Sequence, residues 1–174
     1  MRDPTWPVRL LAGLFLLTAP PTDSLPDGAR AAFERFRALA GEWEEQSTKG
    51  WTGSDSVRVI ARGSAVLFTS AISVHPGEDE NMATVVHLDR GRLLLTHYCV
   101  AGNQPRLAAT NIAEDEHLVE FTFVDGTNLV SRDAGHMDHV LFRFADRDHY
   151  TSKWTWYENG RERWMEDIAH RRRR

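Results

Sequence analysis

The chain has 174 residues, enough for one domain of ordinary size and a short leader. Apolar residues make up 41% of the chain and charged residues 26%, which is a globular composition and excludes a disordered or fibrous protein. The formal net charge is −4, so no overall positive field attracts nucleic acid, and we expect no nucleic-acid partner. Cys99 is the single cysteine, which excludes an intramolecular disulfide.

The first 24 residues differ in character from the rest of the chain. Arg2 and Arg9 precede the apolar run of residues 10–19, which is shorter than the roughly 20 residues that cross a bilayer as a helix. An apolar run of this length after basic residues is typical of a secretory signal. We therefore expect a leader over residues 1–24 and an exported protein, periplasmic or extracellular, without stable membrane insertion. A disordered start and an uncleaved anchor are the alternatives.

A short helix is predicted after a Pro-rich linker. From Asp27, which can cap a helix N-terminus, apolar residues recur at spacings of three and four as far as Ala40. This spacing places them on one helical face. Gly41 follows and is expected to end the helix, because glycine readily adopts the conformation that terminates helices. Residues 25–40 are thus predicted to be a linker and a helix.

Beyond the helix the apolar spacing changes to two, and Gly, Asn and Asp separate runs rich in β-branched and aromatic residues. The clearest turns are Asp89-Arg90-Gly91 and Asn159-Gly160. No helix of crossover length separates two of these runs, which argues against a parallel sheet. The pattern predicts about ten strands, over residues 42–48, 56–62, 65–74, 82–88, 92–99, 106–113, 117–124, 137–145, 148–157 and 161–169.

Apolar and polar residues alternate along the predicted strands, which indicates that each strand has one buried face and one solvent-exposed face. In the seventh strand, Val119 and Phe121 alternate with Glu120 and Thr122. A sheet built from this many consecutive hairpins exposes two edges unless it closes on itself. We therefore predict an all-β, antiparallel up-and-down barrel over residues 41–170, with the helix closing one end. A two-sheet sandwich is the alternative.

Gly41-Glu42-Trp43 resembles the G-x-W signature of lipocalin-like (calycin) proteins, which follows a short helix at the start of the first strand. The resemblance implies that Trp43 plugs one end of the barrel beneath the helix. In such barrels an Arg from the closing strand often lies across the indole as a cation–π cap. Arg161 or Arg163, on the last predicted strand, is expected to take that role.

Longer segments carry a second resemblance. Residues 95–106 (Leu-Thr-His-Tyr-Cys-Val-Ala-Gly-Asn-Gln-Pro-Arg), 123–129, 135–139 and 154–160 resemble a family of uncharacterised, often exported bacterial proteins with a lipocalin-like fold. The match covers most of residues 35–165. It implies the fold and the export of the protein, and it brings no established reaction.

The predicted strand count is also similar to that of fatty-acid-binding proteins and of the haem-binding nitrobindins. The nitrobindin pattern extends the first motif to G-x-W-x-G-x-G, whereas this chain has Glu45 and Ser47 at the matching positions. That departure argues against haem, and no cofactor is predicted. His170 lies where the resemblance places a haem-ligating His, but it adjoins residues 171–174, four Arg that are expected to form a solvated tail.

His97 and Cys99 stand two apart on one predicted strand, so their side chains are expected on one face, with those of Leu93 and Leu95. With His139 from a later strand, they are a candidate metal or thiol site. The alternative is a hydrogen-bonded core histidine beside a buried thiol. Without a second Cys a zinc ion lacks its usual ligands, and no metal site is predicted.

His136 and His139 stand three apart at the start of a predicted strand. This spacing points them to opposite faces unless a bulge intervenes. Pairs of His136 with Asp138, or of His139 with His97 across the barrel, are easier to form.

The segment after the fifth predicted strand carries polar groups suited to a barrel mouth. Asn103, Gln104 and Arg106 are predicted to hold the polar end of a ligand whose apolar part lies inside, with Arg106 as a carboxylate or phosphate clamp. The alternative is a turn that satisfies its own backbone. A buried His97 also needs a hydrogen-bond partner, and the candidates are Tyr98, Asn103, Gln104 and His139.

The sequence thus favours non-catalytic binding of a small, partly apolar or amphipathic molecule inside the barrel. One alternative is an enzyme or metalloprotein that uses His97, Cys99 and His139, and another is a structural or stress-related module without a small ligand. An apolar cavity of about 300 Å³ or more inside the barrel would favour ligand binding. A barrel whose interior is filled by side chains would favour the structural module. The predicted ligand-binding residues are His97, Tyr98, Cys99, Asn103, Gln104, Arg106 and His139, and no catalytic residue is predicted.

Overall fold

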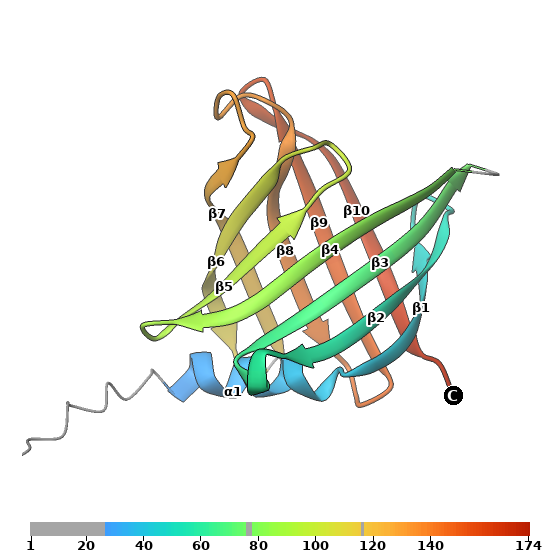
Figure 1. The fold of residues 1–174 in the computed structure, drawn as a ribbon, viewed down its shortest axis with the longest axis vertical. Coiled ribbons are helices and arrows are strands. Elements are labelled where there is room, and N and C mark those ends of the chain that lie inside the picture. Colours follow the sequence, from blue (N-terminus) through green and yellow to red (C-terminus); the bar gives the residue numbers. More distant parts are fainter. Residues whose placement is uncertain (1–26, 76–77, 116) are drawn as a thin grey trace, which may run out of the picture.

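The protein forms a closed antiparallel barrel of ten strands, with a helix lying across one end (Figure 1). This computed structural model describes residues 27–75, 78–115 and 117–174, so the predicted leader lies outside the described residues. The barrel confirms the predicted fold class. The sandwich alternative is wrong, because the first strand pairs with both the second and the tenth.

All ten predicted strands are present, with different bounds. The second strand is predicted to begin at residue 56 and begins at 52 in the structure. The tenth is predicted to end at residue 169 and ends at 172. The elements are α1 (Asp27–Ala38), β1 (Gly41–Ser47), β2 (Thr52–Ile60), the 3-10 turn η1 (Ala61–Gly63), β3 (Ala65–His75), β4 (Glu78–Asp89), β5 (Arg92–Tyr98), β6 (Gln104–Ala113), β7 (Leu118–Thr127), β8 (His136–Phe144), β9 (His149–Glu158) and β10 (Arg161–Arg172).

The core lies inside the barrel and beneath α1. Alternate strand residues point inward, as predicted for Val119 and Phe121, which are fully buried. From α1, Phe36 inserts its ring edge-on against Phe142 and Phe144, with centroids 5.1 and 5.2 Å away. The helix therefore seals its end of the barrel with an aromatic cluster.

The helix ends earlier than predicted, and Gly41 has a different role. Helix α1 stops at Ala38, and Gly41 is the first residue of β1. Its φ is +143°, and a Cβ at this position would lie 2.5 Å from Nη1 of Arg172. The positive φ at the start of β1, rather than a helix cap, therefore favours glycine here, since other residues rarely adopt it.

Trp43 is fully buried at the end of the barrel that α1 closes, as predicted. Its indole N–H donates to the carbonyl oxygen of Leu39 at 2.8 Å, in the connection that follows α1. Its ring meets the ring of Tyr150 edge-on, with centroids 4.8 Å apart. The indole thus joins the connection after α1 to β9, two strands away in the barrel wall.

The cation above Trp43 is Arg172, and not Arg161 or Arg163 as predicted. The guanidinium carbon of Arg172 lies 4.3 Å from the centre of the indole, because β10 continues to this residue and pairs it directly with Trp43. Arg161 and Arg163 stand at the other end of β10, where Arg163 forms an ion pair with Glu158.

The C-terminal arginines are not simply a solvated tail. Arg171 and Arg172 belong to β10, and Arg172 donates to the carbonyl oxygens of Ala38 at 3.1 Å and Ala40 at 2.8 Å. These carbonyls belong to the end of α1 and the connection after it, so the arginine satisfies acceptors that a helix end leaves open. Part of the expected tail therefore connects the last strand of the barrel to the end of the helix.

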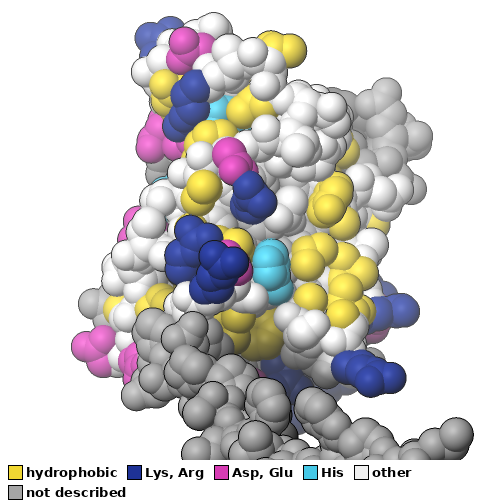
Figure 2. All heavy atoms as spheres, turned by 60° about the vertical axis from the view of Figure 1, so that its left-hand side comes forward, with side chains coloured by type: hydrophobic (Ala, Val, Ile, Leu, Met, Phe, Trp, Pro, Cys, Tyr) yellow, Lys and Arg dark blue, Asp and Glu magenta, His cyan; other side chains and the backbone are white. Residues whose placement is uncertain are grey.

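The outer surface mixes charges of both signs. Figure 2 shows the face that lies to the left in Figure 1, with basic and acidic side chains side by side and hydrophobic side chains in scattered groups. That distribution agrees with the small net charge of −4. Among the described residues, no helix has the length and apolarity needed to cross a membrane.

Candidate functional site

The barrel encloses a cavity of about 70 Å³. Its wall is partly aromatic, with Phe68, Phe142 and Trp154, and partly polar. The cavity is smaller than the roughly 300 Å³ expected for the binding hypothesis. Its lining residues are Glu45, Trp51, Asp55, Phe68, Ser70, Ile72, Met82, Thr84, His97, Met137, Phe142, Tyr150, Ser152, Trp154, Glu166, Ile168 and His170.

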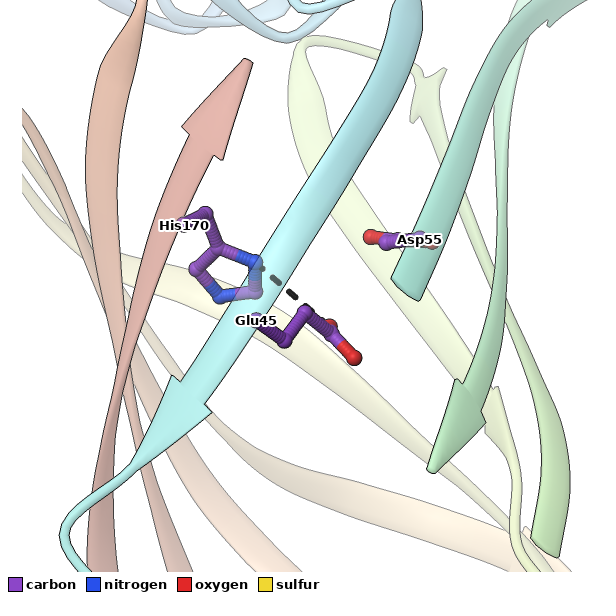
Figure 3. Close-up of side chains that lie close together, drawn as sticks. All are labelled: Glu45, Asp55 and His170. Carbon is purple, nitrogen blue, oxygen red and sulfur yellow. Dashed lines mark ion pairs between the residues drawn. The ribbon is translucent and has the colours of Figure 1, made fainter. Parts of the chain in front are cut away.

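Two acids and a histidine from three strands converge in this cavity: Glu45 on β1, Asp55 on β2 and His170 on β10 (Figure 3). We refer to these three residues as the acid–histidine cluster. One side-chain oxygen or nitrogen from each lies within 4.8 Å of the other two. Nδ1 of His170 is 3.5 Å from Oε1 of Glu45. All three residues are buried, with exposed fractions of 4 to 5%.

Strand register explains why these residues meet. Glu45 and His170 are direct partners in the ladder between β1 and β10, so their inward side chains are neighbours. The partner of Glu45 on β2 is Gly53, two residues before Asp55, which makes Asp55 a diagonal neighbour on the same face. A shared inner face therefore assembles the cluster.

Gly53 provides the room for the Glu45 carboxylate. A Cβ at Gly53 would lie 2.7 Å from Oε2 of Glu45 and 2.9 Å from the backbone oxygen of Ala71. The backbone oxygen cannot move as a flexible side chain can, so this position excludes larger residues. Gly53 is thus part of the construction of the site.

Burial favours the uncharged form of each residue in the cluster. It raises the pKa of Glu45 to about 8, with a further rise from Asp55 and an opposing hydrogen bond from Ser70. Burial also raises the pKa of Asp55 to about 7, against the lowering effect of a hydrogen bond from Tyr150. For His170, burial lowers the pKa to about 3. A positive charge entering the cavity would reverse the effect on the two acids.

Each member of the cluster is held by a neighbouring polar group. Ser70 donates to Oε2 of Glu45 at 2.9 Å, and the Tyr150 hydroxyl donates to Oδ2 of Asp55 at 3.4 Å. The Tyr150 ring also stacks on His170, with centroids 4.0 Å apart. The three side chains are therefore oriented by other residues of the cavity wall.

The imidazole of His170 is anchored through its other nitrogen. Its Nε2 lies 2.9 Å from Oγ of Ser152, which also accepts a hydrogen bond from the Trp154 indole at 3.2 Å. Within the described residues, Nδ1 of His170 and Oδ1 of Asp55 are buried without a hydrogen-bond partner. Leaving a buried polar atom unpaired costs about 1–3 kcal/mol, so both atoms favour a ligand in the cavity.

His97 also lines the cavity, as the sequence predicted. It is 5% exposed, and burial lowers its pKa to about 4. Its Nδ1 lies 2.9 Å from Oγ1 of Thr84, its direct partner on β4, and this is none of the partners proposed from the sequence. Its Nε2 has no hydrogen-bond partner among the described residues.

Glu166 is a third buried acid in this cavity, beside Glu45 and Asp55. It accepts hydrogen bonds from Ser47 at 2.5 Å and from the Trp51 indole at 2.8 Å, both on its Oε2. Burial raises the pKa of Glu166, while these two hydrogen bonds lower it. Because Glu166 is already engaged by two donors, it differs from the partnerless atoms of the acid–histidine cluster.

The polar residues predicted at the barrel mouth bind other parts of the chain. Asn103 is buried, and its amide donates to the carbonyl oxygen of Gly135 at 2.8 Å. The side-chain oxygen of Gln104 accepts hydrogen bonds from Thr127 and Asn128. These contacts tie Asn103 and the start of β6 to the end of β7 and the connection between β7 and β8.

Arg106 is half-exposed and forms an ion pair with Asp125, its Nε lying 2.8 Å from Oδ1 of that residue. The predicted carboxylate clamp therefore already holds a carboxylate of its own chain. Tyr98 is half-exposed, and Cys99 lies in the turn after β5. None of these three is among the residues described as lining the cavity.

His139, from the predicted site, and His136, considered beside it, are not among the residues that line the cavity. His139 points outward, since its neighbour Val140 is in the core, and its Nε2 lies 2.8 Å from Oε1 of Glu120. A bulge precedes it on β8. His136 is fully buried 3.3 Å from Asp138, the pair considered from the sequence. Of the suggested cluster of His97, Cys99 and His139, only His97 faces the cavity.

Sequence reasoning noticed Glu45 only as a departure from a motif and missed Asp55 and Glu166. The available signal was the strand period, because Glu45 is two residues from the buried Trp43 and so shares its face. Haem does not fit here, because the cavity of about 70 Å³ is far below the 300 Å³ and more of ordinary ligand pockets. The Glu45 side chain also lies directly beside His170.

Comparisons with known proteins add little to this geometry. No protein-family model matches the chain, and no curated protein matches its sequence. Among solved structures, the chain is similar to a protein of unknown function from the DUF3598 family of Nostoc punctiforme. The two are 9% identical, the match covers 82% of this chain and 99% of the other, and the TM-score is 0.24.

Proposed function

We propose that the protein is a non-catalytic binding protein that holds a compact, partly apolar ligand inside the barrel. The observation that carries the proposal is a pair of buried, partnerless atoms in the cavity, Oδ1 of Asp55 and Nδ1 of His170. With Glu45 they favour a positively charged or hydrogen-donating group. The apolar part of the ligand lies against the aromatic wall.

The size of the cavity limits the ligand. A cavity that binds benzene measures about 150 Å³, and about 70 Å³ is available here. We infer a ligand of a few non-hydrogen atoms, and not a fatty-acid-like chain. Phe68, Phe142 and Trp154 provide the apolar contacts, as in small-molecule sites where few polar groups set the orientation.

The two alternatives have less support from the geometry. An enzyme based on His97, Cys99 and His139 requires side chains that converge, and only the first of these faces the cavity. A purely structural barrel would fill its interior, because buried polar atoms without partners reduce stability. The cavity and its partnerless acceptors therefore favour ligand binding.

Filling the cavity should abolish ligand binding. Ile72 is buried and lines the cavity, so Ile72→Trp places an indole where the ligand would lie. We expect n-propylamine to perturb the Trp154 indole N–H resonance in the wild-type protein and to bind at least about tenfold more weakly to Ile72→Trp. Val59→Trp, near the end of β2 where the side chain is 37% exposed and outside the cavity lining, is the matched control and should retain binding. Equal affinities of the wild type and Ile72→Trp would contradict the proposal.

His97→Ala separates a binding role from a structural one. The change removes a polar contact to the ligand, leaves the Thr84 hydroxyl without its partner, and should reduce both affinity and stability, the latter by about 1–3 kcal/mol. Thr84→Val breaks the same hydrogen bond but leaves the imidazole in the cavity. We expect Thr84→Val to lose stability while n-propylamine affinity is kept. If both variants bind as well as the wild type, His97 has no part in binding.

A further inference from the structure

We propose that Glu45, Asp55 and His170 bind a divalent transition-metal ion, of the kind represented by Zn²⁺, Co²⁺ and Mn²⁺. The ion is the positive group at the polar end of the cavity, so this inference rests on the proposed function and names one component of what the cavity holds. The aromatic part of the wall is left for the apolar part of the ligand.

The ligand set suits such an ion. One imidazole nitrogen and two carboxylate oxygens are donors that Zn²⁺ and related ions accept, at about 2.0–2.2 Å each. Bonds of that length to a common ion place ligand atoms about 3–4 Å apart. Nδ1 of His170 and Oε1 of Glu45 are already 3.5 Å apart, and Asp55 is within 4.8 Å. A rotation of the Asp55 side chain therefore completes the set.

The surroundings have the arrangement of a second coordination shell. Metal-binding histidines usually bond their other nitrogen to a fixed partner, and metal-binding carboxylates are themselves hydrogen-bonded. Here Ser152 holds Nε2 of His170, Ser70 holds Glu45, and Tyr150 holds Oδ2 of Asp55. Nδ1 of His170 and Oδ1 of Asp55 are left without a partner, and the Glu45 carboxylate, both of whose oxygens lie near the Ser70 hydroxyl, keeps lone pairs for an ion.

Charge favours a divalent ion over an organic cation. The two carboxylates together carry two negative charges when ionised, and a neutral imidazole adds none. An ion of charge +2 balances them, whereas one ammonium group leaves a net negative charge in a buried site, which is costly. No other group of three His, Cys, Asp or Glu in the described part of the chain has donor atoms this close together.

The test is metal binding by the full chain after removal of bound metal with a chelator. Titration with Co²⁺, followed by visible absorption, and with Zn²⁺, followed by calorimetry, should show one saturable site. Glu45→Gln, Asp55→Asn and His170→Gln should each weaken it by at least about tenfold. Two control variants should keep a metal affinity within about threefold of the wild type. Glu166→Gln changes a buried acid of the same cavity, and His139→Gln changes the histidine beside Glu120 on the outside of the barrel.

A second measurement does not depend on the variants folding. Mn²⁺ bound to the cluster should broaden the indole N–H signal of Trp154, which bonds to Ser152 beside His170, before that of Trp156. Affinity should also increase from pH 6 to pH 8, because the ion displaces protons from the two acids. Circular dichroism and thermal unfolding establish which variants are folded.

The outcomes separate this inference from the proposed function. Absence of saturable metal binding by the wild type, or an equal loss in Glu166→Gln and Glu45→Gln, overturns the metal site. If n-propylamine binds and no metal does, an ammonium group is the occupant, so the metal site fails while the proposed function stands. If a metal binds and n-propylamine does not bind with or without it, the metal site stands and the proposed amphipathic ligand fails. If neither binds, both fail.

Discussion

Replacing Trp43 with alanine is expected to lower the free energy of unfolding by about 3–5 kcal/mol. The indole is fully buried, so its removal loses apolar contact and leaves a cavity at the end of the barrel. The change also frees the carbonyl of Leu39, which accepts the indole N–H, and removes the surface on which Arg172 lies. Urea unfolding followed by circular dichroism measures the difference.

Arg172→Met is the companion variant to Trp43→Ala. It keeps much of the apolar stem over the indole but removes the charge and the bonds to the carbonyls of Ala38 and Ala40. We expect a loss of about 1–2 kcal/mol, smaller than that of Trp43→Ala. A loss below about 1 kcal/mol for Trp43→Ala would mean that Trp43 does not plug the barrel.

The metal-free protein is expected to lose stability as the pH rises from about 6.5 to 8. The pKa values of Glu45 and Asp55 are raised by burial to about 8 and about 7, so the folded state keeps protons that the unfolded state has released. Their stabilising contribution is present at low pH and is lost as the pH passes through these folded-state values. The expected fall in unfolding free energy is about 1–2 kcal/mol.

Two buried histidines act in the opposite direction at lower pH. Burial lowers the pKa of His97 to about 4 and that of His170 to about 3, so between pH 4 and 6.5 the unfolded state binds the extra protons and the contribution of these histidines to stability rises with pH. In this pH range the rise in stability from the histidines largely offsets the fall from Glu45 and Asp55. Above pH 6.5 the acids dominate, and Glu45→Gln should flatten the decline. Urea unfolding at a series of pH values tests this, and a constant or rising stability above pH 6.5 would contradict it.

The sequence predicted the fold because its evidence is local. Alternation such as that of Val119 and Phe121, and turns such as Asn159-Gly160, located all ten strands, and closure followed from their number. Strand ends were less predictable, since they depend on a neighbour. Residues 171–172 read as a charged tail, but pairing with β1 continues β10 through both of them.

The site was only partly predictable, because it depends on register between distant strands. The interior position of His97 follows from its phase with Leu95 on the same strand, and the structure shows it. Asp55 joins Glu45 only through the pairing of β1 with β2. Conversely, Asn103 and Arg106 resembled ligand contacts because their partners, Gly135 and Asp125, are far away in the sequence.

The pairing of the first strand with the last affects when the protein can fold. Contacts between residues far apart in the chain form late and slow the folding of β proteins. Trp43 and the end of α1 obtain their final cover from Arg172, so a ribosome-bound chain emerging from its N-terminus cannot complete the barrel before its last strand is released. Until then, the chain exposes the inner faces of its strands and two open sheet edges, a state that is prone to aggregation. Assembly of the acid–histidine cluster also waits for this step, because His170 arrives on the same strand.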